Sequence, residues 1–500
     1  MKKGKKHQIF RGMMIVLLLF IISGCQKKDE TKERDPFTIM TILHTSEIPS
    51  NRIATLLEEK TNTDIHIQWV PNGNYIETLY AAFATDSLPE ATFLGNITTY
   101  LYFKEAMNDG QFWEIGPLLD EFPNLKNLNQ STYDNLSVDG KIYALYQGRR
   151  QARSGLIYRK DWADRLGLSA PTTIDEFYEM ARAFTEDDPD GNGINDTFGL
   201  VDRSDLIYGA FKTVASWFGT PNGWGEKDGK ILPDFMFPEY VETMDFFKKL
   251  RDDGYMNRDF PLTSKEDQQS LLENGEAGMY IGSLGDVLPI YNEAMKINPA
   301  VEFDVQNKII GPKGTFHIWS LPGYHSAVVF PKSAVKTEER LKEILSFFDQ
   351  LASPELANLI FWGIEEEHYT VKNGYASVNA PAEIIEKEVK PYQALEIGEP
   401  ETNGRYEHIP NAKIREKAER LMKENEQYRV EDNSIQLISP THIAVGDHLE
   451  QIIHDATYEY ILGIIDEKGF NEKIQEWKQY GGEQVIEEYT RSFHEKKGNF

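Results

Sequence analysis

Residues 188–196 combine oxygen-bearing side chains and glycine in the spacing of a metal-binding loop. Five groups in this segment could each present an oxygen to a cation: Asp188, Asp190, Asn192, Asp196 and the carbonyl of Ile194. Gly193 permits the sharp turn that such a loop needs, and the spacing matches the first nine positions of an EF-hand loop. Hard oxygen ligands favour a hard cation, so this segment predicts a structural calcium site.

The loop departs from a complete EF-hand at its end. An EF-hand carries a bidentate glutamate at its twelfth position, whereas Gly199 stands there in this chain. Aspartate, asparagine and glycine also form tight turns without any ion, and such a turn is the alternative interpretation. The loop is expected to join a helix to residues 198–200.

Cys25 is the only cysteine of the chain, and it follows a segment typical of protein export. Four lysines within residues 1–6 precede an apolar run at residues 13–22 and then two small residues. This order describes a secretory signal peptide, and the run is shorter than the roughly 20 residues of a membrane-spanning helix. The ending at residues 22–25 resembles a lipobox. This resemblance implies cleavage before Cys25 and a lipid anchor on its sulfur, with palmitate among the attached acyl chains. An ordinary signal peptide with a chance cysteine is the alternative.

The mature chain is predicted to be a large, tethered globular protein. Residues 1–24 are expected to be removed as the signal peptide, and the polar residues 25–36 to form a lipidated tether. The remainder is long enough for two domains, and its stability must come from its core because no disulfide is possible. A net charge of −27 argues against nucleic acid as a partner. We expect a monomer on the extracellular face of the cell membrane.

Apolar runs and helical periodicity alternate along the chain. Strands are predicted at residues 37–43 and 65–70, and helices at residues 49–59 and 75–84. The same alternation recurs further along the chain, in residues 174–184, 241–250, 279–281, 326–330 and 341–351. This order is typical of α/β units with parallel strands. Residues 365–433 are expected to be linkers and exposed helix, and residues 450–493 two or three closing helices.

Six ordered groups of residues carry a resemblance to a known family. They are YIETL (75–79) with LPE (88–90), WEIGPLLD (113–120) with PNL (123–125), DGKIYAL (139–145), LIYRKDW (156–162) with LGL (166–168), NGEAGMY (274–280) and GGEQVI (481–486). Together they resemble the extracellular solute-binding proteins of carbohydrate ABC importers, in particular the lipoprotein group of Gram-positive bacteria.

This resemblance implies a fold, a ligand and a partner. The fold is an α/β, two-lobed, periplasmic-binding-protein-like type II fold with hinge crossings. Lobe 1 would hold residues 37–150 and 323–375, and lobe 2 residues 151–322 and 376–500. A saccharide, most simply an oligosaccharide, would bind between the lobes and pass to the permease subunits of an ABC transporter. Alginate-binding relatives carry a similar calcium loop with a carboxylate after its ninth position, where this chain has Thr197.

Residues 146–153 hold three arginines and a tyrosine where the resemblance places the first crossing between lobes. Planar guanidinium groups bind carboxylates in bidentate geometry, and aromatic faces can pack on the C–H surface of a sugar. We therefore expect ligand contacts from four residues: Tyr146, Arg149, Arg150 and Arg153. An arginine that faces the cleft would suit an acidic sugar such as a uronic acid, and surface salt bridges are the alternative.

Five further residues are candidates for ligand contacts. Trp319 lies near the expected second crossing, and Asp286 follows a predicted strand. The other three are tryptophans from lobe 2 and from a loop after a helix: Trp217, Trp224 and Trp362. Each tryptophan alone also fits a position in the core, which is the alternative for all of them.

Two other classes of function remain open from the sequence. A secreted glycosidase or lyase would need a placed pair of carboxylates, and residues 365–368 (EEEH) are the densest acidic cluster. A contiguous charged run is more typical of a solvated loop, and the chain has no zinc-protease, nucleophile-elbow or Walker motif. We therefore expect a binding protein and not an enzyme. A sugar-sensing lipoprotein is the third possibility.

Overall fold

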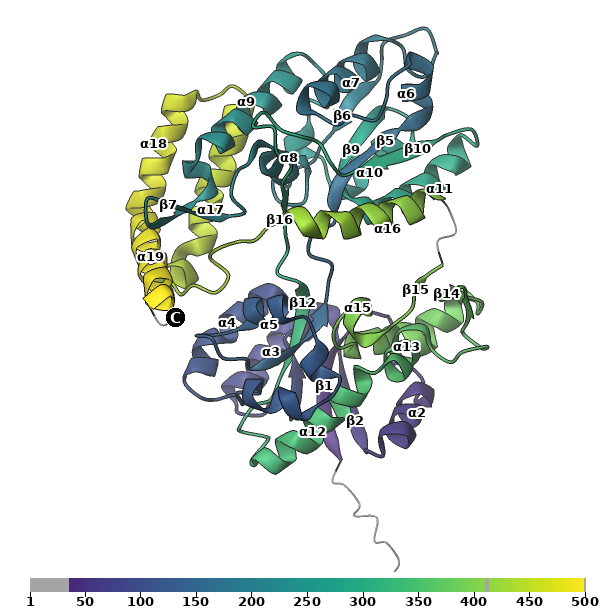
Figure 1. Cartoon of the computed structure of the whole chain (residues 1–500), viewed down its shortest axis with the longest axis vertical. Helices are drawn as coiled ribbons and strands as arrows, with labels where there is room; N and C mark the ends of the chain where they lie inside the picture. Colours follow the sequence, from purple (N-terminus) through teal and green to yellow (C-terminus); the bar gives the residue numbers. More distant parts are fainter. Residues whose placement is uncertain (1–35, 410–412, 499–500) are drawn as a thin grey trace, which may run out of the picture.

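The protein is described by a computed structural model that covers residues 36–409 and 413–498. Figure 1 shows two lobes joined by crossing strands in the middle of the molecule. Each lobe has its own sheet and its own apolar core. The predicted signal peptide, Cys25 and nearly all of the tether lie outside the described residues. Within those residues, no helix is both long enough and apolar enough to cross a bilayer.

Lobe 1 is built on a five-stranded sheet in the order β2-β1-β3-β12-β4. The strands in that order are Ile65–Pro71, Phe37–Leu43, Ala91–Phe93, Tyr324–Val329 and Ala144–Gly148. β1 runs parallel to β2 and β3, and β12 runs antiparallel to β3 and β4. The carboxyl ends of β1, β3 and β4 therefore share one edge of the sheet with the amino end of β12.

Helices surround this first sheet. They are α2 (Arg52–Thr61), α3 (Tyr75–Ala84), α4 (Ile97–Asn108), α5 (Gln130–Leu136), α12 (Glu338–Leu351) and α13 (Pro354–Trp362). β1 is almost entirely buried because its apolar residues face helices on both sides of the sheet. The expected strand at residues 37–43 and the expected helix at residues 75–84 coincide with β1 and α3.

Lobe 2 has a four-stranded sheet in the order β10-β5-β9-β6. These strands are Phe303–Gln306, Ser154–Arg159, Ala277–Ser283 and Phe198–Val201. β5 is antiparallel to β10 and β9, and β6 is parallel to β9. The amino end of β5 therefore shares an edge with the carboxyl ends of β6 and β9.

The helices of lobe 2 come from two distant parts of the chain. The first set is α6 (Lys160–Leu166), α7 (Ile174–Glu186), α8 (Ala210–Phe218), α9 (Pro238–Asp252), α10 (Lys265–Glu273) and α11 (Val287–Ile297). The second set is α16 (Lys413–Asn425), α17 (Pro440–Ile461), α18 (Glu467–Trp477) and α19 (Glu483–Gly498). The hairpin of β7 (Trp224–Lys227) and β8 (Lys230–Pro233) packs against α19, so the chain terminus closes this lobe.

Local sequence explains where several of these helices begin. Thr173 precedes α7 and its hydroxyl accepts the Glu176 N–H at 3.2 Å, a cap that typically stabilises a helix by about 1 kcal/mol. Acidic residues in the first turn of α7 also stabilise the helix by interacting favourably with its dipole. Phe177 and Phe184 then bury the apolar face of α7 in the core of lobe 2.

The chain passes between the lobes three times. The first crossing joins β4 to β5, and the second joins β11 (Ile318–Trp319) to β12. The third leads from β15 (Glu407–His408) in lobe 1 to α16 in lobe 2. Because the first two crossings adjoin the edges described above, the two sheets present those edges to each other.

The second boundary of lobe 1 lies later than the expected residue 375. Val389, Tyr392 and Leu395 belong to the core of lobe 1, and the Tyr392 hydroxyl donates to the Ser50 carbonyl at 2.8 Å. The small sheet β13-β14-β15 (Tyr369–Lys372, Tyr375–Val378 and β15) also precedes the third crossing. The assignment of residues 376–408 to lobe 2 was therefore wrong, because short apolar motifs are hidden in a segment dominated by charges.

Candidate functional site

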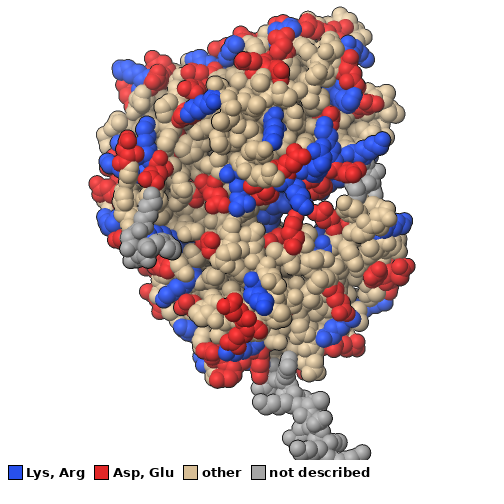
Figure 2. Space-filling view, in the orientation of Figure 1, with Lys and Arg blue, Asp and Glu red and all other residues tan. Residues whose placement is uncertain are grey.

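Polar and charged side chains gather on the two facing edges of the lobes. The edge of lobe 1 carries His44 after β1, Asn96 after β3, Arg149 after β4 and His325 in β12. The edge of lobe 2 carries Arg153 before β5, Asp202 after β6 and Asp286 after β9. Figure 2 shows a hollow between the lobes with basic and acidic side chains on its walls. Ligand sites favour such interfaces between domains.

Direct contacts across the hollow fix which segments face each other. The Lys104 ammonium of α4 donates to the carbonyl of Ile435 in lobe 2 at 2.9 Å. Arg429 of lobe 2 donates to the Ser131 hydroxyl of α5 at 3.3 Å. The second half of α4 and the start of α5 in lobe 1 thus lie near residues 429–435 of lobe 2.

Arg149 and Arg153 have guanidinium groups without a partner. Among the described residues, neither makes a hydrogen bond or an ion pair. Burial lowers the pKa of Arg153, the positive charge of Arg149 lowers it further, and the negative charge of Asp286 opposes this fall. Two unpaired arginines side by side in a chain of net charge −27 make a local site for an anion.

Histidines of lobe 1 lie close to this pair of arginines. His325 is accessible to solvent in the hollow, yet the surrounding walls remove enough water to lower its pKa to about 4. The charges of Arg149 and His44 lower it further. His325 is therefore neutral near pH 7 and can serve as a hydrogen-bonding group for a ligand.

Unlike Arg149 and Arg153, Arg150 has charged partners within the protein. Its guanidinium pairs with Glu407 at short distance and lies 3.4 Å from Glu401 and 3.5 Å from Glu419. Glu401 and Glu407 belong to lobe 1, whereas Glu419 lies on α16 of lobe 2. The expectation that Arg150 contacts ligand is therefore not supported, because its guanidinium group is already paired with three carboxylates.

Tyr146 and Trp217 lie in the cores of the two lobes. Both side chains are 0% exposed. The Tyr146 hydroxyl accepts the Asn129 N–H at 2.7 Å, and the Trp217 ring packs 6.1 Å from Phe177. The predicted ligand contacts of these two residues were wrong because tertiary packing covers them completely.

Trp224 and Trp362 also have structural partners. The Trp224 ring packs 4.8 Å from Tyr489 of α19 and so fastens the closing helices. The Trp362 indole donates to the Tyr406 carbonyl at 2.9 Å, and its side chain is nearly buried. The predicted ligand contact of Trp362 is corrected to a packing role, whereas that of Trp224, whose side chain is half-buried, stays a prediction.

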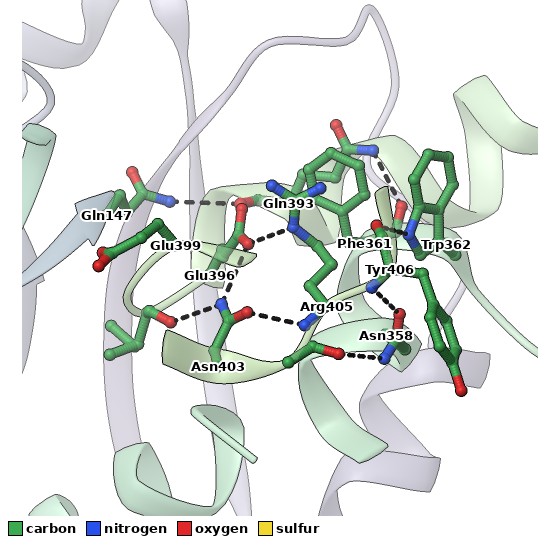
Figure 3. Close-up of polar contacts among 12 residues, drawn as sticks. Gln147, Asn358, Phe361, Trp362, Gln393, Glu396, Glu399, Asn403, Arg405 and Tyr406 are labelled. Carbon is green, nitrogen blue, oxygen red and sulfur yellow. Dashed lines mark hydrogen bonds and ion pairs between the residues drawn. The ribbon is translucent and has the colours of Figure 1, made fainter. Parts of the chain in front are cut away.

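Figure 3 shows the polar contacts that hold the segment before the third crossing against lobe 1. Arg405 pairs with Glu396 at 2.5 Å and lies over the Phe361 ring at 3.7 Å. Asn403 donates to Glu396 at 3.2 Å and accepts the Arg405 N–H at 2.9 Å. These contacts fix the backbone that carries Glu401 and Glu407 toward Arg150.

Asp286 and Trp319 remain on the lobe 2 side of the hollow. Asp286 accepts the Tyr280 hydroxyl at 2.8 Å, and the Lys265 ammonium lies 3.5 Å away. The Trp319 indole donates to the Thr213 hydroxyl at 2.9 Å, and its side chain is 5% exposed. Trp319 thus supports the wall, and the exposed aromatic in front of it is a different residue.

Tyr208 is that residue, and the sequence analysis missed it. Its ring lies 6.0 Å from Trp319 at a steep angle and its side chain is 41% exposed. Lys212 lies on the same wall, with its ammonium 5.2 Å from the centre of the Trp319 ring. The sequence did contain a signal for this wall: Tyr208 and Lys212 both follow β6 closely, near the edge of the sheet that faces lobe 1.

The loop at residues 188–196 is folded around its own polar groups. The Asn192 amide donates to Asp190 at 2.9 Å and to Asp196 at 3.2 Å. One oxygen of Asp188 accepts the Gly193 N–H at 3.0 Å, and the other is buried without a partner among the described residues. Over the described ranges, no three histidine, cysteine, aspartate or glutamate side chains form a metal-binding group. The unpaired oxygen of Asp188 leaves one acceptor free for a cation, whereas the Asn192 amide occupies the carboxylates of Asp190 and Asp196 and the Asn192 oxygen accepts the Ile194 N–H at 2.8 Å.

The acidic run at residues 365–368 has structural contacts. Glu367 forms an ion pair with Arg52. His368 is completely buried, and its Nδ1 accepts the Ile364 N–H at 2.9 Å. Two residues of the cluster that suggested a glycosidase thus have structural roles: Glu367 in a salt bridge and His368 in the core.

A family profile matches most of the described chain. Residues 51–358 match the family described as "Bacterial extracellular solute-binding protein". The chain belongs to this family. Two relatives from Bacillus subtilis (strain 168) are similar to this chain over nearly their whole lengths. The Polygalacturonan/rhamnogalacturonan-binding protein YtcQ is 37% identical over 99% of this chain and 100% of its own, and Lipoprotein LipO is 31% identical over 97% and 99%.

Solved structures confirm the expected fold class. The crystal structure of the alginate-binding protein AlgQ2 without calcium ion covers 93% of this chain and 100% of its own, with a TM-score of 0.66 and 16% identity. An identity this low shows the fold alone. The expected two-lobed solute-binding fold and the expected membership among extracellular solute-binding proteins are thus both confirmed.

Proposed function

We propose that this protein captures an acidic oligosaccharide between its lobes and delivers it to an ABC permease. The observation that carries the proposal is the pair Arg149 and Arg153, which lack partners at the first crossing. A guanidinium group binds a carboxylate through two parallel hydrogen bonds, which suits a uronic acid. Arg150 does not share this role because its charge is neutralised within the protein.

The similarity to YtcQ supports an acidic ligand. That protein is named for binding polygalacturonan and rhamnogalacturonan. Polygalacturonan carries a carboxylate on every sugar residue, so a protein of net charge −27 would repel it without local cations. The unpaired arginines supply such cations where the two lobes meet.

The chain is further proposed to be a monomer anchored by lipid on the outer face of the membrane. The lipobox-like ending at Cys25 and the 31% identity to a protein named Lipoprotein LipO support the anchor. A calcium ion is proposed in the loop at residues 188–196, held by Asp188, Asp190, Asn192, the Ile194 carbonyl and Asp196. There it would tie the end of α7 to β6.

Isothermal titration with galacturonic-acid oligomers tests the proposed ligand. Arg153→Gln should weaken binding roughly 10- to 150-fold, because a charge-assisted hydrogen bond typically contributes about 1.5–3 kcal/mol. Arg149→Gln should have a similar effect. Arg182→Gln is the matched control, since Arg182 pairs only within and just beyond α7.

Two outcomes would contradict the proposal. One is equal affinity for galacturonic-acid oligomers and for the same oligomers with their carboxylates reduced to alcohols. The other is unchanged affinity in both arginine variants while the control behaves as wild type. Melting temperatures of all variants show that the fold is intact.

A further inference from the structure

A cavity lies at the end of lobe 1 that is opposite the hollow. It has a volume of about 290 Å³, and its walls come from the end of α3, the loop after α4, the approach to β3 and the segment after β12. β1 and β3 run parallel and β12 runs antiparallel to β3, so the start of β3 and the end of β12 share the sheet edge that faces away from lobe 2. The cavity is therefore a different site from the hollow between the lobes.

One part of the cavity wall is apolar and fixed in place. Leu88 and Phe112 are buried, and the Phe83 ring packs nearly parallel to the Phe112 ring with 6.2 Å between their centres. Phe112 also pairs with Pro331 in an isolated β-bridge, which ties the loop after α4 to the end of β12. Because backbone pairing fixes these two segments, the cavity is already formed without a ligand.

The other part of the wall carries one positive, one negative and two neutral polar side chains. These belong to Lys332, Asp86, Gln111 and Ser333. Within the part of the chain that the structure describes, none of the four side chains forms a hydrogen bond or an ion pair. The Lys332 ammonium lies 5.3 Å from the centre of the Trp113 ring, a contact that uses none of its N–H donors. Lys332 and Asp86 are both exposed, so a ligand can reach two separate, opposite charges.

The same end of lobe 1 carries the start of the tether. Arg340 of α12 donates to Glu90 at 2.8 Å and to the Pro36 carbonyl at 3.1 Å, and α12 lies at the end of lobe 1 away from lobe 2 (Figure 1). Glu90 follows Leu88 of the cavity by two residues, so the cavity and the tether start on one side of the lobe. The twelve residues 25–36 can span at most roughly 40 Å. A lipid at their start would keep the cavity near the bilayer surface.

We propose that this cavity binds a zwitterionic phospholipid headgroup that carries a phosphate and a primary ammonium. The proposal rests on the lipid anchor of the proposed function, which brings the cavity to a bilayer. The Lys332 ammonium and the Ser333 hydroxyl donate to the phosphate oxygens, and the Asp86 carboxylate accepts hydrogen bonds from the ligand ammonium. Phe83 and Leu88 contact the glyceryl carbons that follow the phosphate.

Size and charge favour this ligand over other molecules at a cell surface. A volume of about 290 Å³ is at the lower limit of typical ligand sites, so it admits a headgroup and not an oligosaccharide. The ends of α3 and α4 lie beside the cavity, and the partial negative charge of a helix C-terminus favours an ammonium. A headgroup with a phosphate alone would bring a second negative charge toward Asp86. A free zwitterion of the same chemistry is the other source, and the experiment separates it from lipid.

Isothermal titration with glycerophosphoethanolamine, the soluble headgroup, tests the site. The protein is the mature chain with Cys25→Ala, which lacks the lipid attachment point and retains every described residue. Lys332→Gln and Asp86→Asn should each weaken binding at least roughly fivefold, because each removes one charge-assisted contact. Glycerol phosphate and ethanolamine, each with one of the two charges, should bind more weakly to wild type. Lys126→Gln and Asp120→Asn are the matched controls, since both residues are exposed in lobe 1 outside the cavity.

Flotation with vesicles identifies the source of the headgroup. Vesicles of phosphatidylethanolamine mixed with phosphatidylcholine should bind more of the Cys25→Ala protein than vesicles of phosphatidylcholine alone. Both kinds of vesicle have the same net charge, and only the ethanolamine headgroup has N–H donors for Asp86. Addition of Lys332→Gln or Asp86→Asn should remove the difference between the two kinds of vesicle.

Each outcome supports or overturns the headgroup site. Binding of the soluble headgroup without a difference between the vesicles overturns the membrane source and assigns the cavity to a free zwitterion. Absence of soluble binding, or soluble binding that neither cavity variant changes, overturns the site itself. Binding of galacturonic-acid oligomers should be the same in wild type and in both cavity variants, so failure of that ligand or of lipid labelling at Cys25 contradicts the proposed function and not the cavity. Melting temperatures show that the variants are folded.

Discussion

At the scale of single residues, Glu399 is a buried carboxylate whose ionisation destabilises the folded state. Burial raises its pKa from 4.5 to about 7, and the hydroxyls of Tyr146 and Thr402 close to the carboxylate oppose that rise only in part. An unfolded glutamate loses its proton near pH 4.5, whereas the folded one keeps it until about pH 7. The folded state therefore binds more protons in this window, and its stability falls as pH rises from about 5 to 7.

Glu399→Gln should remove this part of the pH dependence. Thermal unfolding should show a higher melting temperature for the variant than for wild type at pH 8 and nearly equal values at pH 5. Glu242→Gln, on the exposed side of α9, is the matched control. A wild-type advantage at pH 8 would show that the ionised carboxylate has a stabilising partner.

At the scale of elements, Arg150 links α16 of lobe 2 to the segment before the third crossing. Glu401 and Glu407 hold it from lobe 1, and Glu419 approaches from lobe 2. Arg150→Gln should let the lobes separate, with a larger radius of gyration in small-angle scattering of the ligand-free protein. In wild type, 1 M salt should produce a similar expansion because it screens charges beyond about 3 Å.

Arg182→Gln serves as the control for this experiment too, since its ion pairs stay within lobe 2. Identical scattering curves for wild type and Arg150→Gln at low salt would show that the other contacts between the lobes suffice. The Lys104 contact to Ile435 is the next candidate for that role.

The loop between α7 and β6 belongs to the same scale. A bound calcium ion stabilises the fold by mass action, by about 2.7 kcal/mol when free calcium is 100 times the dissociation constant. Chelator should therefore lower the melting temperature of wild type by a few degrees. Asp188→Asn combined with Asp190→Asn should melt lower and no longer respond to chelator.

Asp228→Asn is the control for the loop because Asp228 also occupies a turn with positive φ, at 53°. An identical melting curve with and without chelator, together with the absence of calcium by elemental analysis, would contradict the calcium site. Retained chelator sensitivity in the double variant would place the ion elsewhere in the protein.

At the scale of the whole molecule, the chain leaves lobe 1 at the end opposite the hollow. β1 begins at Phe37 and its carboxyl end lies on the edge that faces lobe 2. The Pro36 carbonyl accepts a hydrogen bond from Arg340 at 3.1 Å, which fixes the point where the tether starts. An anchor at Cys25 would therefore leave the site between the lobes away from the membrane.

Cys25→Ala should change the location of the protein without changing its fold. The variant should appear unprocessed or in the culture medium, whereas two acyl chains would hold wild type at the membrane. Cell fractionation with labelled fatty acid measures both. Equal labelling and equal membrane association of wild type and variant would contradict the lipid anchor.

The sequence determined the elements of the fold better than the boundaries between lobes. Buried strands such as β1 need continuous apolar residues, and amphipathic helices such as α3 need apolar side chains at helical spacing, so local patterns locate both. The segment at residues 376–408 was assigned to the wrong lobe because its short apolar motifs lie among charged residues. The core of lobe 1 recruits it through contacts such as Tyr392 to Ser50, which are remote in sequence.

The site shows the same division between sequence and tertiary structure. The sequence by itself identified the arginine-rich first crossing, and the unpaired Arg149 and Arg153 come from it. Only the tertiary structure separated them from Arg150, because the three glutamates that occupy Arg150 lie more than 250 positions away in the chain. It also placed Trp217 in the core and Tyr208 on the wall, because burial depends on how distant elements pack and not on residue type.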